Sequence, residues 1–186
     1  PSAAMKLRVA ALVLAASATL ACAGGDDGSG GEGDHCACIG GDAMMIEPLC
    51  DVGATIDAFA TCTGTDMPQP GMTTCEAPFS WVYSTAQIDE ALTALRDRAP
   101  ATITITRSLD GNYSGSYAYA YSPGDGTVFF QSGGYADGFF LGLPVDHLEL
   151  KEASYFDGCL AEADLAARVD CLFAIGDATL GACEPP

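Results

Sequence analysis

The apolar residues between positions 84 and 98 recur at the spacing of a helix. They are Ile88, Ala91, Leu92 and Leu95. Ser84 and Gln87 have the spacing of a capping box, in which two side chains satisfy free amide groups at the start of a helix. Pro100 cannot continue a helix because it lacks an amide hydrogen. We therefore predict a helix from about Thr85 to Arg98.

A different pattern follows, in which polar and apolar residues alternate as in a strand with one buried face. Thr102 to Thr106 alternates Thr with Ile. Turn signals rich in Asp-Gly, Pro-Gly and Gly-Gly separate the next segments. The strands predicted there are Ser116 to Ser122, Thr127 to Gln131, Phe139 to Leu143 and Asp146 to Lys151. Pro144 suggests that the last strand begins at a bulge or lies on an edge.

The two ends of the globular region differ in regularity. An imperfect apolar stripe predicts a second helix from about Leu160 to Ala174. Residues 34 to 78 contain five cysteines and many Gly and Pro residues, so we expect an irregular segment in which Ala43 to Ile46 and Ala54 to Ala60 form short helical turns. The fold class is therefore α+β, an antiparallel meander of four to five strands flanked by two helices, with a cysteine-rich irregular N-terminal segment.

The beginning of the chain has the layout of an export signal. Lys6 and Arg8 precede the apolar run Val9 to Ala21, which is too short to span a membrane, and Cys22 follows directly. This arrangement resembles bacterial lipoproteins, in which such a cysteine is lipidated and the leader is removed. The resemblance covers residues 5 to 34 and implies a lipid anchor on Cys22. The alternative is an ordinary secretory leader that is cleaved after Ala18 or Ala23.

Behind Cys22 the sequence predicts a linker followed by one domain. Residues 23 to 34, AGGDDGSGGEGD, contain no side chain that could anchor a core. Residues 1 to 21 are upstream residues and signal peptide, and residues 22 to 34 are lipid anchor and tether. Residues 35 to 186 are long enough for a single disulfide-stapled globular domain.

The cysteine count bears on both the anchor and the topology. The chain has nine cysteines, and setting Cys22 aside leaves an even number for disulfides: Cys36, Cys38, Cys50, Cys62, Cys75, Cys159, Cys171 and Cys183. Five precede Glu76 and three follow Asp157, so an odd number of bridges joins the two groups if all eight pair. On one continuous helix Cys159 and Cys171 would lie about 18 Å apart, too far for a bridge. We expect Cys171 to pair with Cys183, and Cys159 with the N-terminal group.

Charge excludes one class of partner. The formal net charge is −18, and all 25 acids lie beyond Cys22, whereas two of the seven basic residues lie in the leader. Such a polyanion is repelled by nucleic acid and by anionic lipid headgroups. We therefore expect no nucleic-acid partner. We expect the protein to contact a membrane through the lipid anchor alone.

Few residues point to catalysis or to metal binding. His35, Cys36 and Cys38 form a local cluster, but no second ligand pair follows at zinc spacing, so disulfides are favoured and we expect no metal and no cofactor. The recurring Asp-Gly pairs are explained by turn chemistry. His147 has no accompanying nucleophile motif.

The candidate binding residues are aromatic. The run S-Y-A-Y-A-Y-S places tyrosines on one face of a predicted strand and small residues on the other. The tyrosine row is Tyr113, Tyr117, Tyr119 and Tyr121. If this row is exposed, a saccharide or a protein can bind on it; otherwise it packs under the cysteine-rich segment or against Phe129.

Two function classes remain open. The first is an exported lipoprotein of the bacterial cell envelope, anchored in the outer membrane or at the cell surface, with a noncatalytic binding or envelope role. The second is an exported hydrolase that uses paired carboxylates. An exposed tyrosine face favours the first, and a pocket with two close carboxyl groups of perturbed pKa favours the second.

Overall fold

The computed structural model describes residues 53–64, 74–109, 114–136, 139–142 and 144–183. The predicted leader, anchor and tether, residues 1 to 34, lie outside this part of the chain. So do His35, Cys36, Cys38, Cys50 and Tyr113, and the side chain of Cys183.

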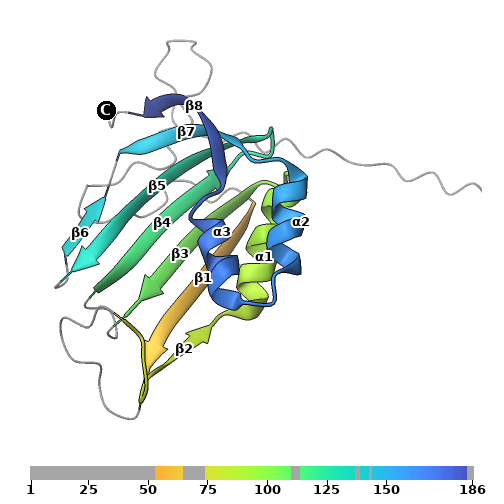
Figure 1. Ribbon diagram of the computed structural model, residues 1–186. Coiled ribbons are helices and arrows are strands. Elements are labelled where there is room, and N and C mark those ends of the chain that lie inside the picture. The colour runs from red at the N-terminus through yellow and green to blue at the C-terminus, as the bar shows by residue number, and fades with distance from the viewer. Residues whose placement is uncertain (1–52, 65–73, 110–113, 137–138, 143, 184–186) are drawn as a thin grey trace, which may run out of the picture. The chain divides into compact units, whose positions relative to one another are not determined.

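One mixed sheet contains all the described strands (Figure 1). Seven strands lie side by side in the order β2-β1-β3-β4-β5-β7-β8, and β6 pairs with β5 off this path. The pair β1 and β3 is parallel, and the other pairs are antiparallel. The strands are β1 (Ala54–Thr63), β2 (Ser80–Tyr83), β3 (Ala101–Ser108), β4 (Ser114–Ser122), β5 (Thr127–Ala136), β6 (Phe139–Gly142), β7 (Val145–Leu150) and β8 (Gly176–Cys183).

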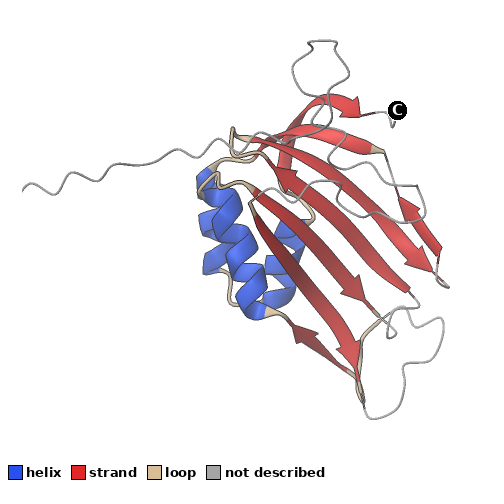
Figure 2. Ribbon diagram, turned by 180° about the vertical axis from the view of Figure 1, so that it is seen from behind, coloured by secondary structure: helices blue, strands red, loops and turns tan. Residues whose placement is uncertain are grey.

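Three helices pack on one face of this sheet (Figures 1 and 2). They are α1 (Thr85–Arg96), α2 (Ala153–Ala161) and α3 (Leu165–Leu172). The apolar stripe predicted for the first helix is confirmed, because its four residues are fully buried. They pack with Ile56 of β1, Ile103 and Ile105 of β3, and Phe156 of α2. The side of β3 that contains Ile103 and Ile105 thus faces the core.

The α+β class is confirmed, but the expected meander of four to five strands with two helices is too small. The five predicted strands correspond to β3, β4, β5, β6 and β7, and the structure adds β1, β2 and β8. The expected helical turn at Ala54 to Ala60 is wrong, since this segment is β1, paired in parallel with β3. Its buried positions Ile56, Ala58, Ala60 and Cys62 have the period of a strand.

The predicted second helix is two helices. α2 ends before Glu162, and α3 begins after Asp164, whose side chain accepts a hydrogen bond from the amide of Ala166. The turn between them brings the Cα atoms of Cys159 and Cys171 to 6.2 Å, and the two residues form a disulfide. The expectation that they have different partners is therefore wrong, because it assumed one continuous helix.

A second disulfide joins Cys62 to Cys75, with the Cα atoms 5.7 Å apart. This bridge links β1 to the segment that leads into β2, within the N-terminal cysteine group. The two described bridges confirm disulfide bonding, and neither joins the two groups.

Two local predictions also need correction. Ser84 makes no side-chain cap; instead its hydroxyl accepts a hydrogen bond from the amide of Phe59 and donates one to the carbonyl of Phe59, which ties the start of α1 to β1. The strand β7 is not on an edge, since it lies between β5 and β8. Pro144 precedes it, and the irregularities of its pairing with β8 come later, after His147.

Candidate functional site

The tyrosines of β4 lie on the sheet face that is opposite the helices. We call this the tyrosine face. Residues paired directly across neighbouring strands share a face, so the pairing register assigns its side chains to rows. Row one contains Thr55, Thr102, Tyr121, Phe129 and His147. Row two contains Asp57, Thr104, Tyr119 and Gln131, and row three contains Phe59, Thr106 and Tyr117.

Aromatic contacts link the middle of this face across three strands. Tyr121 stacks on Phe129 with ring centroids 6.0 Å apart, which confirms the predicted cross-strand pair. Phe129 in turn stacks on His147 at 4.3 Å with nearly parallel rings. His147 is the last residue of row one, and it packs against the ring of Phe129. These offset and stacked pairs fix the side chains relative to the sheet.

Tyr117 and Tyr119 form a second aromatic pair on β4. Their rings meet edge to face at 4.7 Å, and the hydroxyl of Tyr117 donates a hydrogen bond to that of Tyr119 at 2.5 Å. Burial, followed by this hydrogen bond, raises the pKa of Tyr117 above its usual value. The Tyr117 phenol therefore remains protonated at neutral pH and supplies no anion for catalysis.

Exposure differs between the three rows. In row one, Thr102, Tyr121 and Phe129 are buried, with Tyr121 only 5% exposed. In row two Tyr119 is buried at 9%, but Thr104 and Gln131 are half-buried. In row three no residue is buried, and Tyr117 is half-buried. The tyrosine row is thus not a uniformly exposed platform.

The exposed part of the face lies over β1 and β2. We call it the β1 strip, and it consists of Thr55, Asp57, Phe59 and Val82. Phe59 is 40% exposed and Val82 48% exposed, both large for apolar side chains. Val82 joins the strip because its register partner Thr61 lies on the same face as Phe59. The sequence analysis missed these residues, although the alternation of buried positions in residues 54 to 63 could have revealed them.

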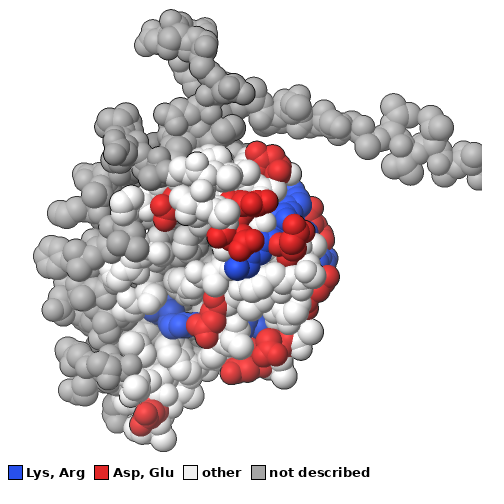
Figure 3. Space-filling model, turned by 45° about the horizontal axis from the view of Figure 1, so that its top comes forward, with Lys and Arg blue, Asp and Glu red and all other residues white. Residues whose placement is uncertain are grey.

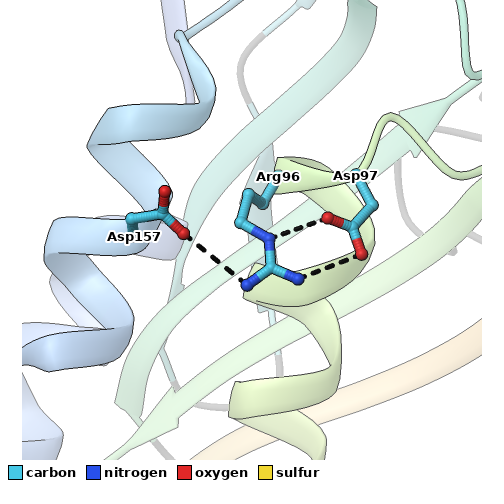
Figure 4. A network of polar contacts seen from close by, with 3 residues as sticks. All are labelled: Arg96, Asp97 and Asp157. Atoms are coloured by element: carbon cyan, nitrogen blue, oxygen red, sulfur yellow. Dashed lines mark hydrogen bonds and ion pairs between the residues drawn. The ribbon is translucent and has the colours of Figure 1, made fainter.

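The cationic side chains of the domain all lie away from the β1 strip and make internal contacts. Arg96 binds Asp97 at 2.7 Å and Asp157 at 3.6 Å (Figure 4). Arg107 binds Asp170 and lies over the ring of Phe173. The remaining contacts are Lys151 with Asp177, Arg168 with Asp89, and Arg98 with the carbonyl oxygen of Leu150. Acidic and basic side chains accordingly lie next to one another on the surface shown in Figure 3.

Among the described residues, two carboxyl groups have clearly shifted pKa values, and both shifts are downward. The hydrogen bond from Arg96 lowers the pKa of Asp97. Burial acts to raise the pKa of Asp125, but hydrogen bonds from the hydroxyl and amide of Thr127 outweigh it and lower the value. A general acid at neutral pH needs a raised pKa, so neither group fits that role. The contacts of Asp125 support the interpretation of this Asp-Gly pair as a turn.

Comparison of the chain with family models, with curated proteins and with solved structures finds no match. Within the described ranges, no three His, Cys, Asp or Glu residues come together as metal ligands. The helices among those same residues are too short or too polar to cross a membrane.

Proposed function

We propose that this protein is an exported lipoprotein of the bacterial cell envelope, whose domain binds a ligand without transforming it. The layout of residues 5 to 34 supports export and anchoring through Cys22. The observation that carries the proposal is the pair of disulfides, Cys62–Cys75 and Cys159–Cys171, because bridges of this kind persist in oxidising compartments outside the cytosol.

We place the ligand on the β1 strip and the adjoining half-buried Tyr117. The two aromatic rings, Phe59 and Tyr117, lie in one row and offer flat apolar surfaces. Asp57 and the Thr104 and Thr106 hydroxyls provide hydrogen-bond acceptors and donors beside them. Aromatic surface next to a carboxylate and hydroxyl groups suits a ligand that has apolar C–H faces and many hydroxyl groups.

The proposed ligand is therefore a neutral saccharide. Asp57 is the charged residue of the strip, and the described cations make their contacts elsewhere. An anionic ligand would meet a negative charge without a compensating cation. A neutral sugar avoids that cost, and its hydroxyl groups can donate to Asp57.

Calorimetric titration of the mature domain with soluble neutral oligosaccharides, of hexose and of N-acetylhexosamine type, tests this proposal. The Phe59→Ala variant should bind about tenfold more weakly, since an aromatic contact contributes on the order of 1 kcal/mol beyond its buried area. Leu180→Ala is the matched control, because Leu180 is an exposed apolar residue at 54% on the edge strand β8. Equal binding by wild type and Phe59→Ala, or no binding to any member of the panel, would refute the proposal.

A further inference from the structure

Within the described part of the chain, the outer side of β2 is an open strand edge. β2 is the last strand on its side of the sheet, and no described strand pairs with its outer side (Figures 1 and 2). The amide of Ser84 donates to the carbonyl oxygen of Phe59, so these residues form a hydrogen-bonded pair that continues the antiparallel register of β1 and β2. Bonded and non-bonded pairs alternate along such a ladder, so Trp81 and Tyr83 direct their backbone N–H and C=O groups away from β1. This edge can therefore accept another extended segment.

The side chains of β2 form an aromatic surface beside the open edge. Trp81 and Tyr83 pair with Cys62 and Ala60, which are buried, so their rings lie on the face that the helices cover. Both rings are half-buried and pack against the core, with centroids 6.2 Å apart. Val82 points to the opposite face and is 48% exposed. A strand added at this edge would place alternate side chains beside the two rings and beside Val82.

The charges near Tyr83 favour a cationic occupant. Burial, followed by the negative charge of Asp164, raises the pKa of the Tyr83 phenol, so the carboxylate lies close to this ring. Asp164 is exposed and accepts a hydrogen bond from the amide of Ala166, and it belongs to none of the ion pairs among the described residues. Arg107 also acts on Tyr83, but it is bound to Asp170. The carboxylate of Asp164 is therefore available to a basic side chain that lies over the rings.

We propose that the edge of β2 binds an extended segment of another protein, in which Lys or Arg residues alternate with apolar residues. The backbone of the segment bonds that of Trp81 and Tyr83, its basic side chains lie over the two rings and reach Asp164, and its apolar side chains lie beside Val82. A second copy of this chain does not match, because its own β2 has no basic residue and both copies have a net charge of −18. The inference does not rest on saccharide binding, since Phe59 lies on the opposite face from the two rings.

Amide hydrogen exchange, measured by NMR on the full-length protein, tests the strand addition. The probe is a short peptide of alternating Lys and Val, and the control peptide has Pro in place of Val, which keeps the charge but prevents a ladder. With saturating Lys-Val peptide, the amides of Trp81 and Tyr83 should exchange about tenfold more slowly, and that of Val82, which faces β1, should change less. Equal protection by both peptides, or no protection of Trp81 and Tyr83, would overturn the inference. Protection without any peptide, in a protein that sediments as a dimer, would identify a second copy as the occupant and overturn it too.

The Asp164→Asn variant tests the charge, with the affinity for the Lys-Val peptide measured by calorimetry at low salt. Asn also caps helices, so α3 keeps its first turn, while the peptide should bind about threefold to fivefold more weakly. Asp177→Asn is the matched control, because it removes an equal charge from β8 at the other edge of the sheet and should leave the affinity unchanged. Equal weakening in both variants would show only a general attraction between a polyanion and a cation, and would overturn the inference.

The Phe59→Ala variant separates this surface from the proposed saccharide site. It should bind the Lys-Val peptide as wild type does, because Phe59 lies on the tyrosine face. A large loss of peptide binding in this variant would place the peptide on the tyrosine face and contradict the β2 edge. Saccharide binding can fail in its own titration without any effect on these results, so the two failures are distinguishable.

Discussion

At the scale of single residues, the positions that sequence patterns misassign are those with long-range partners. Ser84 has the spacing of a helix cap, yet its hydroxyl bonds the backbone of Phe59, 25 residues away. No local pattern contains that partner. The buried residues of α1 follow from the helical period alone, because their environment is set by the face of the helix that they occupy.

Thr102 offers a residue-scale prediction. Its hydroxyl oxygen is buried on the tyrosine face and has no hydrogen-bond partner within the described part of the chain. A buried hydroxyl without a partner costs on the order of 1 to 3 kcal/mol. Thr102→Val keeps the branched shape that strands favour and removes the oxygen, so we expect the free energy of unfolding to rise by about 1 kcal/mol.

Urea denaturation of the oxidised protein, followed by circular dichroism, measures this change. Thr104→Val is the control, since Thr104 is half-buried in the next row of the same strand and gains less from the exchange. A loss of stability in Thr102→Val comparable to that of a broken hydrogen bond would show that the hydroxyl has a partner.

At the scale of elements, prediction succeeded where a strand or helix has a strong period and failed where tertiary contact decides. The Thr and Ile alternation identified β3, and the tyrosine run identified β4. β1 was missed because its buried face contains small residues among many turn formers, and it gains stability from parallel pairing with β3. The break between α2 and α3 was missed because Asp164 caps the second helix inside an almost continuous apolar stripe. The residues of the candidate site were missed for the same reason, since Phe59 and Asp57 belong to β1.

The disulfide between α2 and α3 leads to an element-scale prediction. It closes a loop of sequence separation 12, for which chain entropy predicts about 3 kcal/mol of stabilisation. Replacing both Cys159 and Cys171 by Ala should lower the free energy of unfolding by roughly 2 to 4 kcal/mol, with a further cost because Cys159 is buried in the core.

Thermal unfolding of this variant and of a Cys62→Ala, Cys75→Ala variant compares two bridges of similar loop length. Both should unfold at lower temperature than wild type. If removal of Cys159 and Cys171 left the melting temperature unchanged, the packing of α2 and α3 would not depend on the bridge.

At the scale of the whole molecule, acidic residues outnumber basic ones by 25 to 7. The formal net charge is −18, and the five basic residues within the described part of the chain each contact an acid or a backbone carbonyl. On the face shown in Figure 3, acidic side chains lie beside these cations. Such a domain gains no electrostatic attraction to an anionic lipid surface. Membrane association therefore depends on the anchor proposed at Cys22.

Fractionation of cells that produce the full chain tests this dependence. Wild type should partition with membranes, and its extracted N-terminus should have the added mass of lipid on Cys22. Cys22→Ala should release the domain into the soluble fraction or leave it unprocessed. An unlipidated N-terminus directly after Ala23 would instead identify a secreted protein and refute the anchor, while it leaves the disulfides unaffected.

The parallel pairing of β1 with β3 affects the order in which the strands can pair as the chain is synthesised. The strands β3, β4 and β5 follow one another closely in the sequence and pair in that order, so this part of the sheet forms from contacts close in sequence. β1 is synthesised first, but its partners β2 and β3 both follow it along the chain. On a growing chain β1 can pair with β2 once residue 83 is free, but its parallel partner β3 is complete only at residue 108. Until then the edge of β1 that pairs with β3 stays open, and an open strand edge is a template for aggregation or for a binding chaperone.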